Sequence, residues 1–499
     1  MTSSLQLIQR AQKWTKRTAI VSNQQDYSYQ QLLDLSQNIA THLLNGLEDL
    51  TEERVAFLVA PSFEYTAVQW GVWQAGGIAV PLCLLHPLPS LEYVLQNTSA
   101  SILVVDAAYY ELLAPLAKKE NIRLLRTETL LKPIPNVKLP VVSENRSAMI
   151  LYTSGTTSLP KGVVTTHANL NFQIKTLVEA WEWQADDHIL NVLPLHHVHG
   201  IINVMSCALW VGACCEFLPK FDATKVWKRF QKGAINVFMA VPTIYFKLIH
   251  HWEQSSAIEQ KSCSDSLKSF RLMVSGSAAL PISVLEQWEQ ISGHTLLERY
   301  GMTEIGMGIS NPYRGKRRSG HIGQALPGVQ IRLVDEQGVV TTDNTPGEIQ
   351  IKGPNVFQEY WQKPEATKKA FSEDGWFLSG DIAQLNAGYY KILGRDSVDI
   401  IKSGGYKISA LEIEDVLRQH PAINDCAVIG IPNPEWGELI VACLILKGGH
   451  ETIIDVAALK NWLKEILSAY KIPRQFIIQS ALPRNVLGKV TKNELKQLF

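Results

Sequence analysis

Residues Tyr152 to Val163, YTSGTTSLPKGV, combine many small hydroxyl groups with one lysine. The eight residues Tyr152 to Leu159 hold five serine and threonine side chains and one glycine, and Lys161 follows shortly after. Hydroxyl and backbone N–H groups in a turn can surround phosphate oxygens, and a lysine supplies the balancing positive charge. The stretch therefore indicates a phosphate-binding loop, with a Ser/Thr-rich surface loop as the alternative.

The spacing of this stretch does not fit the Walker P-loop, which requires G-x-x-x-x-G-K-[ST]. Counted from Gly155, Pro160 stands where the second glycine should be, and Gly162 stands where the magnesium-binding hydroxyl should be. The stretch is therefore not a Walker motif, although its hydroxyl and backbone N–H groups can still surround phosphate oxygens.

The composition is that of an ordinary globular protein with more than one domain. A chain of 499 residues is too long to fold around a single hydrophobic core. Of its residues, 46% are hydrophobic and 19% are charged, and the formal net charge is zero. With no basic excess and no charge run, we expect no nucleic-acid or membrane partner. No apolar run reaches the roughly 18 residues of a transmembrane helix. The seven cysteines lack C-x-x-C or metal-ligand spacing, so we expect reduced, buried thiols in the cytoplasm.

The N-terminal segment allows two interpretations. The first acidic residue is Asp26. Four basic residues precede it, as in a mitochondrial transit peptide: Arg10, Lys13, Lys16 and Arg17. The same segment, LIQRAQKW, also has the pattern of a first helix, and residues 18–44 continue directly as two short strands and a helix. We favour the structural interpretation and a cytoplasmic protein, with a mitochondrial location as the runner-up.

Apolar, β-rich runs alternate with helical periods through the first 320 residues. RVAFLVA precedes a helix through EYTAVQWGVWQAG, and SILVVDA precedes a helix through YYELLAPLAKKE. INVFMAVP and FRLMVSGSA have the pattern of further buried strands that end in glycine or proline turns. This alternation predicts a layered α/β fold whose sheets are largely parallel.

The pattern changes near Gly320 to short strands: VQIRLVD, GEIQIKG and YYKILGR. These runs predict a β-rich subdomain. The helices ALEIEDVLRQH and VAALKNWLKEIL, with the strands DCAVIGI and IVACLIL between them, then predict a compact α+β unit. We place the domain boundary at Arg395, so that residues 1–395 form a large N-terminal domain and residues 396–499 a small C-terminal domain.

Eight separated motifs, in one order along nearly the whole chain, resemble the adenylate-forming superfamily of acyl-CoA synthetases, peptide-synthetase adenylation domains and luciferases. They are YTSGTTSLPKG, LPLHHVHG, SGSAALP, ERYGMTE, GEIQIKGPNVFQEYW, GWFLSGD, ILGRDSVDIIKSGGYKIS and LPRNVLGKV. Within the superfamily, LPLHHVHG, MAVPTIY, RLMVSGSAALP and GHTLLERYGMTEIGM are most similar to malonyl-CoA synthetases.

The resemblance implies a reaction in two halves that uses ATP, Mg²⁺ and coenzyme A. A carboxylate attacks the α-phosphate of ATP. Pyrophosphate is released, and an acyl-adenylate is formed. The thiol of coenzyme A then attacks the acyl carbon and expels AMP. Because the first half gathers negative charge, positioning and positive charge carry most of its catalysis.

The resemblance assigns the phosphate-binding residues. The loop expected to hold the β- and γ-phosphates consists of Thr153, Ser154, Gly155, Thr156, Thr157 and Lys161. Thr303 in GMTE would offer its hydroxyl to the α-phosphate. Glu304 would supply the kind of oxygen ligand that Mg²⁺ prefers.

The resemblance also assigns the nucleoside-binding residues. Those expected around the adenine are Gly276, Ser277, Ala278, Tyr300, Gly301 and Met302, because the family's adenine lies against the residue that matches Tyr300. Asp381 in SGD matches the carboxylate that accepts both ribose hydroxyls, and Arg395 matches the guanidinium beside it. Taken alone, either residue would be interpreted as a solvated surface charge.

Lys489 in PRNVLGKV matches the catalytic lysine of the family. A flexible glycine precedes it, and a mobile small domain could swing it into the cleft. Its ammonium would bridge the carboxylate and the α-phosphate as negative charge gathers between them. An exposed lysine of the C-terminal tail is the alternative.

The resemblance further implies that the small domain rotates after adenylation. Lys489 would leave, and Ser403, Gly404 and Gly405 would line the pantetheine tunnel, where backbone without side chains leaves room. Many members carry Asp or Lys as the pivot two residues after the arginine, but this chain has Ser397 there. The identity of the hinge residue therefore stays open.

The acid pocket of the family is lined by three segments of this chain. The expected acid-binding residues are His197, Val198, His199, Lys247 and Met307, and His197 is also a catalytic candidate. A dicarboxylic acid such as malonate brings a second carboxylate that needs neutralising, because a buried unpaired anion is heavily penalised. Lys247 stands where malonyl-CoA synthetases carry an arginine, and lysine keeps the charge but loses the bidentate fork.

These observations predict a malonyl-CoA synthetase, with methylmalonate as a further substrate. The alternatives are a synthetase for another short-chain or aromatic acid, a stand-alone adenylation enzyme that loads a carrier protein, and a non-catalytic adenylate sensor. The expected partners are small molecules only, in a monomer or homodimer.

Overall fold

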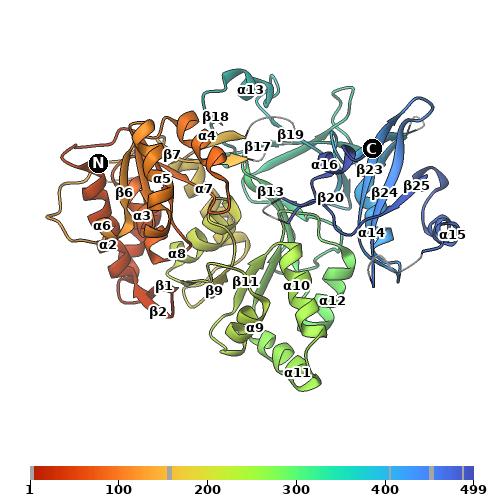
Figure 1. The fold of residues 1–499 in the computed structure, drawn as a ribbon, viewed down its shortest axis with the longest axis horizontal. Coiled ribbons are helices and arrows are strands. Elements are labelled where there is room, and N and C mark those ends of the chain that lie inside the picture. Colours follow the sequence, from red (N-terminus) through yellow and green to blue (C-terminus); the bar gives the residue numbers. More distant parts are fainter. Residues whose placement is uncertain (1–4, 154–159, 404–405, 449–453, 486–487) are drawn as a thin grey trace.

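The computed structural model describes residues 5–153, 160–403, 406–448, 454–485 and 488–499. It confirms the predicted α/β fold class: two large sheets rich in parallel strands are followed by a β-rich subdomain and a small α+β unit. In Figure 1 the chain runs from the N-terminal part at the left, in red and orange, to the C-terminal part at the right, in blue.

The seven-stranded sheet contains the first alternation of strands and helices. In sheet order its strands are β18 (Glu359–Tyr360), β8 (Lys161–Thr166), β7 (Ser147–Thr153), β4 (Ile78–Pro81), β3 (Arg54–Leu58), β5 (Ile102–Val105) and β6 (Arg123–Arg126). Val55 and Phe57 of β3 enter one apolar cluster, whereas Ala56 and Leu58 enter another. Both faces of this parallel region are therefore buried, which explains its continuous apolar runs.

The nine-stranded sheet carries most of the predicted site. In sheet order its strands are β15 (Gln324–Ala325), β14 (Gly306–Ser310), β13 (Leu297–Met302), β12 (Leu272–Ser275), β11 (Val237–Ala240), β9 (His188–Asn191), β10 (Cys214–Phe217), β1 (Thr18–Ser22) and β2 (Gln25–Ser28). Within this order, the six neighbouring strands β13, β12, β11, β9, β10 and β1 run parallel to one another. Their carboxyl ends therefore meet at one edge, where open α/β sheets bind ligands.

Helices cover the sheets, and some of them begin at side-chain caps. Ser28 and Thr166, for example, form capping boxes with the third residue of the helices that they start. The helices are α1 (Gln6–Ala11), η1 (Gln12–Trp14), α2 (Tyr29–Leu44), α3 (Phe63–Gln74), α4 (Leu88–Thr98), α5 (Ala107–Lys119), α6 (Thr127–Leu130), α7 (His167–Ala180), η2 (His199–Ser206), α8 (Cys207–Val211), α9 (Ala223–Gln231), α10 (Pro242–Glu253), α11 (Ala257–Ser266), η3 (Leu267–Ser269), α12 (Ile282–Ser292), α13 (Pro364–Lys369), α14 (Ala410–Leu417), α15 (Val456–Ile466), η5 (Ala469–Lys471) and α16 (Lys492–Lys496).

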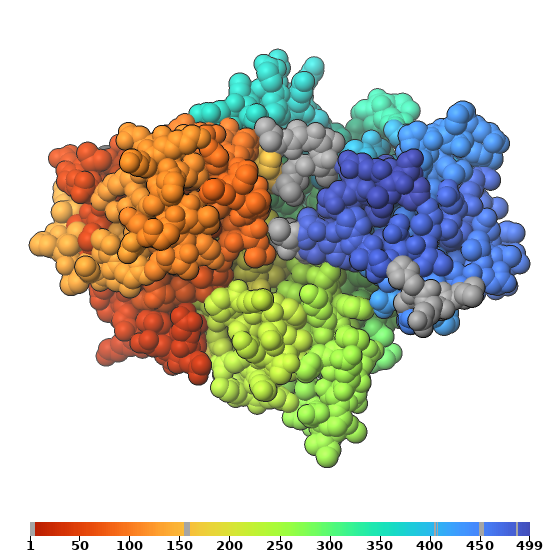
Figure 2. Space-filling view, viewed as in Figure 1, coloured from red at the N-terminus to blue at the C-terminus, as the bar shows by residue number. Residues whose placement is uncertain are grey.

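Two smaller sheets complete the fold. The antiparallel sheet of the β-rich subdomain consists of β16 (Gln330–Val334), β17 (Pro346–Lys352), β19 (Phe377–Asn386) and β20 (Tyr389–Arg395). The C-terminal sheet consists of β22 (Tyr406–Ser409), β21 (Ile400–Ser403), β24 (Gly437–Leu446), β23 (Ile423–Asn433) and β25 (Gln475–Ile478). Buried apolar residues from Ile401 onward form two clusters of their own. In Figure 2 this C-terminal part, in blue, lies against the rest of the molecule.

The basic N-terminal segment is part of the folded protein from Leu5 onward. Arg10 Nε donates to the carbonyl of Trp210 at 2.9 Å, and Arg17 Nε donates to the carbonyl of Gly212 at 2.9 Å. These contacts tie α1 and η1 to α8, as the structural interpretation of this segment predicts.

The cysteines are free thiols, six of them buried and Cys214 half-buried. Burial raises the pKa of the Cys214 thiol to about 12, so this thiol stays protonated at neutral pH. Among the described residues, no helix combines the length and the apolar character needed to cross a bilayer.

A buried charge network holds the C-terminal part together. The ammonium of Lys492, in the first turn of α16, lies 2.6 Å from Asp399 Oδ1 and 2.7 Å from Glu414 Oε1. Burial opposes the charge on Lys492, but the two carboxylates hold its pKa above the ordinary value. The network joins α16, α14 and the start of β21.

Replacing Lys492 by methionine should destabilise the protein by about 3–5 kcal/mol, because two buried carboxylates lose their shared cation. Urea unfolding measures this free energy. Lys464→Met removes an exposed lysine of α15 that contacts only its own helix and should change it by less than about 0.5 kcal/mol. Equal stability of the two variants would contradict a structural role for the network.

Candidate active site

The predicted nucleoside-binding residues gather where β12 and β13 end. Gly276 follows β12, and Arg299 lies in the neighbouring strand β13. A Cβ atom added at Gly276 would lie 2.6 Å from the guanidinium carbon of Arg299, so a larger residue there would displace the Arg299 guanidinium. Ser277 has a φ of +69°, a strained conformation for a serine of the kind that is concentrated at functional sites. Ala278 follows directly.

A hydrogen bond joins β13 to the β-rich subdomain. Tyr300 Oη donates to Asp381 Oδ2 at 2.6 Å, and Arg395 Nη1 lies 3.9 Å from Asp381 Oδ1. Asp381 and Arg395 are also register partners in β19 and β20. Burial raises the pKa of Asp381, while Arg395, Tyr300 and Lys489 oppose this shift. One aromatic ring, one carboxylate and one guanidinium thus meet at this point, with Gly301 and Met302 continuing β13.

Glu304 lies in the turn between β13 and β14 and is buried. Tyr360 Oη donates to Glu304 Oε1 at 2.8 Å, and the ammonium of Lys161 lies 4.1 Å from the centroid of the Tyr360 ring. Burial raises the pKa of Glu304, whereas the Tyr360 hydroxyl and the charge of Lys161 favour its ionised form. Tyr360 thus bridges a carboxylate and a cation that come from different sheets. Thr303, half-buried, immediately precedes Glu304.

The two ends of the predicted phosphate loop are register partners. Thr153 ends β7 and Lys161 begins β8, and the two residues pair across the sheet. The predicted residues Ser154, Gly155, Thr156 and Thr157 lie outside the described residues, as do Gly404 and Gly405 of the predicted tunnel loop. Ser403, which precedes those two glycines, is buried at the end of β21.

The histidines of LPLHHVHG form a buried group near the same edge. The Nε2 atoms of His196, His197 and His199 find no hydrogen-bond partner among the described residues. Burial lowers the pKa of His197 to about 4 and that of His199 well below its ordinary value, so both imidazoles are neutral at pH 7. His199 also begins the π-helical segment η2, a geometry that is frequent at functional sites.

The remaining predicted acid-pocket residues occupy different environments. Val198 packs against the main apolar cluster, and Met307 is fully buried. Lys247 is exposed on α10, and its ammonium lies 5.9 Å from the centroid of the Phe221 ring. The assignment of Lys247 to the acid pocket stays a prediction.

Sequence reasoning missed Arg299, a buried cation in this region. Its side chain is 3% exposed, and its Nε and Nη1 atoms have no hydrogen-bond partner among the described residues. Its Nη2 donates to Ser277 Oγ at 3.2 Å, and Ser277 Oγ lies 3.3 Å from His199 Nδ1. Burial lowers the pKa of Arg299 to about 9, so the guanidinium stays charged at pH 7. The signal was a pair of charged residues, Glu298 and Arg299, directly after the apolar Leu296 and Leu297.

Lys489 lies in a hairpin of the C-terminal part. Its backbone N–H donates to Asn485 Oδ1 at 3.0 Å, and its side chain is exposed. A Cβ atom added at Gly488 would lie 3.0 Å from Thr243 Oγ1 at the start of α10. The hairpin therefore touches the large N-terminal part, and the charge of Lys489 reaches Asp381.

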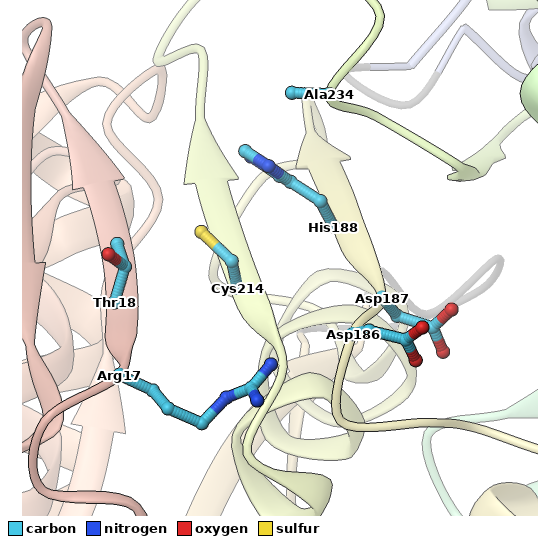
Figure 3. Close-up of a pocket in the computed structure, with 7 residues that line it drawn as sticks. All are labelled: Arg17, Thr18, Asp186, Asp187, His188, Cys214 and Ala234. Carbon is cyan, nitrogen blue, oxygen red and sulfur yellow. The ribbon is translucent and has the colours of Figure 1, made fainter.

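A polar pocket of about 310 Å³ lies at the opposite, amino-terminal edge of the nine-stranded sheet. Figure 3 shows its lining residues: Arg17, Thr18, Asp186, Asp187, His188, Cys214 and Ala234. Two of its titratable groups are paired within the protein, since Asp187 binds Arg271 and His188 contacts Glu216 at 3.1 Å. None of the predicted site residues lies in this pocket.

Comparisons with known proteins agree with this geometry. Residues 7–361 match the family described as AMP-binding enzyme, and residues 412–489 match the AMP-binding enzyme C-terminal domain. The chain is 44% identical over 524 residues to the malonate–CoA ligase ACSF3, mitochondrial, of Xenopus laevis. The alignment covers 97% of this chain and 90% of the relative. It is 39% identical to a malonate–CoA ligase of Arabidopsis thaliana, over 96% of this chain and 86% of the relative.

The fold matches that of MatB from Rhodopseudomonas palustris, a solved structure. The ATP-bound form of that protein superimposes with a TM-score of 0.91 at 33% identity, over 99% of this chain and 98% of MatB. The apo form gives a TM-score of 0.82. Over the whole chain the fold therefore superimposes better on the ATP-bound form than on the apo form.

The unpaired charge of Arg299 should lower the stability of the ligand-free protein. Arg299→Met should raise the free energy of unfolding by about 1–3 kcal/mol, because a desolvated cation with one neutral partner is replaced by an apolar side chain. Urea unfolding without ligands measures it. Arg271→Met is the matched control, because Arg271 is paired with buried Asp187 and its loss should destabilise the protein. A fall of equal size in both variants would contradict the unpaired state of Arg299.

Proposed function

The chain belongs to the family of AMP-binding enzymes, and on this premise we propose that it is an AMP-forming acid–CoA ligase whose substrate is malonate. The observation that carries the choice of a dicarboxylic acid is Arg299, a buried guanidinium with two unpartnered nitrogen atoms beside His199 and Ser277. A desolvated cation of this kind fits a carboxylate, which it can bind through two hydrogen bonds. An acid with a plain hydrocarbon tail would leave the cation unpaired.

The first half-reaction joins malonate to AMP. An oxygen of one malonate carboxylate attacks the α-phosphorus of ATP, and the bond to pyrophosphate breaks. Lys161 would hold the terminal phosphates, Thr303 would hydrogen-bond the α-phosphate, and Asp381 with Arg395 would hold the ribose. Lys489 would lie between the carboxylate and the α-phosphate, where negative charge gathers. The neutral His197 would line the acid pocket without adding charge.

Glu304 fits a magnesium ion that arrives with ATP. Magnesium is commonly bound through one or two carboxylates plus phosphate oxygens, and the described residues contain no cluster of three or more metal-ligating side chains. Glu304 offers one such carboxylate, oriented by Tyr360. When bound, the ion would neutralise charge on the phosphates.

The second half-reaction transfers the acyl group to coenzyme A. The thiol sulfur attacks the acyl carbon, its proton is released, and AMP leaves with one oxygen of the former carboxylate. The segment that begins at Ser403 would line the pantetheine tunnel once the C-terminal part has rotated about the linker after Arg395. The division into residues 1–395 and 396–499 is proposed on the same basis.

The proposal extends to the cellular location and the oligomeric state. We keep the cytoplasm as the proposed location and the mitochondrion as the runner-up, because the vertebrate relatives are named as mitochondrial. A monomer or a homodimer without a nucleic-acid or membrane partner is the proposed state.

Loss of Arg299 should affect malonate far more than butyrate. Arg299→Met should lower kcat/KM for malonate by about 3–5 kcal/mol, a factor of hundreds to thousands, because the distal carboxylate loses its partner. Arg299→Lys should retain part of the activity. Lys464→Met, which removes an exposed lysine of α15, is the control and should leave the preference for malonate unchanged. If Lys247→Met instead abolishes malonate selectivity while Arg299→Met does not, Lys247 is the partner of the distal carboxylate. A wild-type enzyme that prefers butyrate would refute the dicarboxylate proposal.

Lys489 should serve one half-reaction only. Lys489→Ala should abolish pyrophosphate release from malonate and ATP, because the cation that would stabilise the charge between the carboxylate and the α-phosphate is lost. The same variant should still convert a chemically prepared acyl-adenylate and coenzyme A into thioester at close to the wild-type rate. Equal losses in both assays would mean that Lys489 acts throughout the reaction or supports the fold.

A further inference from the structure

Backbone hydrogen bonds link residues 484–485 to residues 488–490, and these two described stretches are called the Lys489 hairpin. Arg484 and Val490 form an antiparallel bridge. The N–H of Asn485 donates to the carbonyl of Lys489 at 2.9 Å, and the N–H of Gly488 donates back to the carbonyl of Asn485 at 2.8 Å. The backbone on either side of Lys489 is thus held by the hairpin itself.

The side chain of Arg484 links the hairpin to the body of the C-terminal part, where Val490 also packs against an apolar cluster. Its Nη1 donates to the carbonyl of Gly488 at 2.5 Å, and its Nη2 donates to Asp425 Oδ2 in β23. Asp425 is itself fixed, because its Oδ1 accepts from Arg418 Nε at 3.4 Å and from the N–H of Cys426 at 2.8 Å. The guanidinium therefore spans from a strand of the sheet to the residue that precedes Lys489.

The position of Lys489 depends on its backbone more than on its side chain. The side chain is exposed and has four rotatable bonds, so it brings little positional order of its own. Its ammonium must nevertheless reach a point between two reacting anions, where a misplacement of about 1 Å can cost a hundredfold in rate. Precision must therefore come from the hairpin and from whatever fixes it.

We propose that Arg484 is a positioning residue that fixes the Lys489 hairpin to β23 and thereby sets where the ammonium of Lys489 enters the site. The planar guanidinium suits this task, because it donates in two directions at once, to a carbonyl and to a carboxylate. The proposal rests on the function proposed above for Lys489. It assigns to Arg484 no contact with a substrate.

The test separates the two half-reactions in Arg484→Met, Arg484→Lys and Asp425→Asn. Adenylation is followed by malonate-dependent pyrophosphate release, and thioester formation is followed with a chemically prepared acyl-adenylate and coenzyme A. Lys464→Met is the control for the loss of an exposed cation from the same part of the chain, and Lys489→Ala is the reference for complete loss of the ammonium.

Arg484→Met should slow adenylation about tenfold to a hundredfold in kcat, leave the KM for ATP within about twofold, and leave thioester formation unchanged. Arg484→Lys should recover only part of the rate, because an ammonium lacks the fork. Asp425→Asn should reproduce the defect, and the double variant Arg484→Met with Asp425→Asn should be little slower than either alone, because both changes break one link. The side chain of Arg484 is 35% exposed and Asp425 keeps Arg418, so the variants should fold; equal melting temperatures check this.

Wild-type adenylation in Arg484→Met, or equal losses in both half-reactions, would overturn the proposal. The reference variant separates this failure from that of the proposed function. If Lys489→Ala loses adenylation selectively and Arg484→Met does not, only the positioning role fails. If Lys489→Ala itself shows no selective loss, the role of Lys489 fails first.

Discussion

The hydrogen bond from Tyr300 Oη to Asp381 Oδ2, 2.6 Å long, connects parts of the chain that otherwise belong to different sheets. Asp381 pairs in register with Arg395, the last residue of β20, and the chain then enters the C-terminal sheet through Asp399. The end of β13, the proposed ribose-binding carboxylate and the start of the linker are therefore fixed relative to one another. The C-terminal part brings Lys489 to a site whose geometry this contact defines.

The proposed reaction brings the phosphates of ATP and the carboxylates of the acid together in one site, and separate layers of the fold supply cations to it. The proposed set is Lys161 from the seven-stranded sheet, Arg299 from the nine-stranded sheet, Arg395 from the β-rich subdomain and Lys489 from the C-terminal part. Arg299 shows the cost of this arrangement, because it is buried and has no charged partner within the part of the chain that the structure describes. A buried charge without a carboxylate partner is destabilising by itself and becomes favourable when an anion enters. Violations of packing rules of this kind are expected at functional sites.

Much of the fold could be predicted from the sequence, because buried parallel strands leave continuous apolar runs. RVAFLVA and SILVVDA became β3 and β5, and EYTAVQWGVWQAG became α3. The site was harder to predict, since Tyr360 reaches Glu304 only through the pairing of β18 with β8, which lie almost 200 residues apart in sequence. Arg299 was missed because local patterns do not reveal whether a charged side chain in a strand has a partner. The exposure of Lys247 depends on which face of α10 packs inward, and that face is set by tertiary contacts.

The central claim is that a carboxylate oxygen of the acid attacks the α-phosphate of ATP, and isotope transfer tests it most directly. Malonate labelled with oxygen-18 in its carboxylates is incubated with the protein, ATP, Mg²⁺ and coenzyme A, and the nucleotide product is analysed by mass spectrometry. We expect AMP that carries a single oxygen-18 for each thioester formed, because the attacked phosphate keeps the bridging oxygen when the thiol expels AMP. Unlabelled AMP, or ADP with labelled inorganic phosphate, would contradict the account.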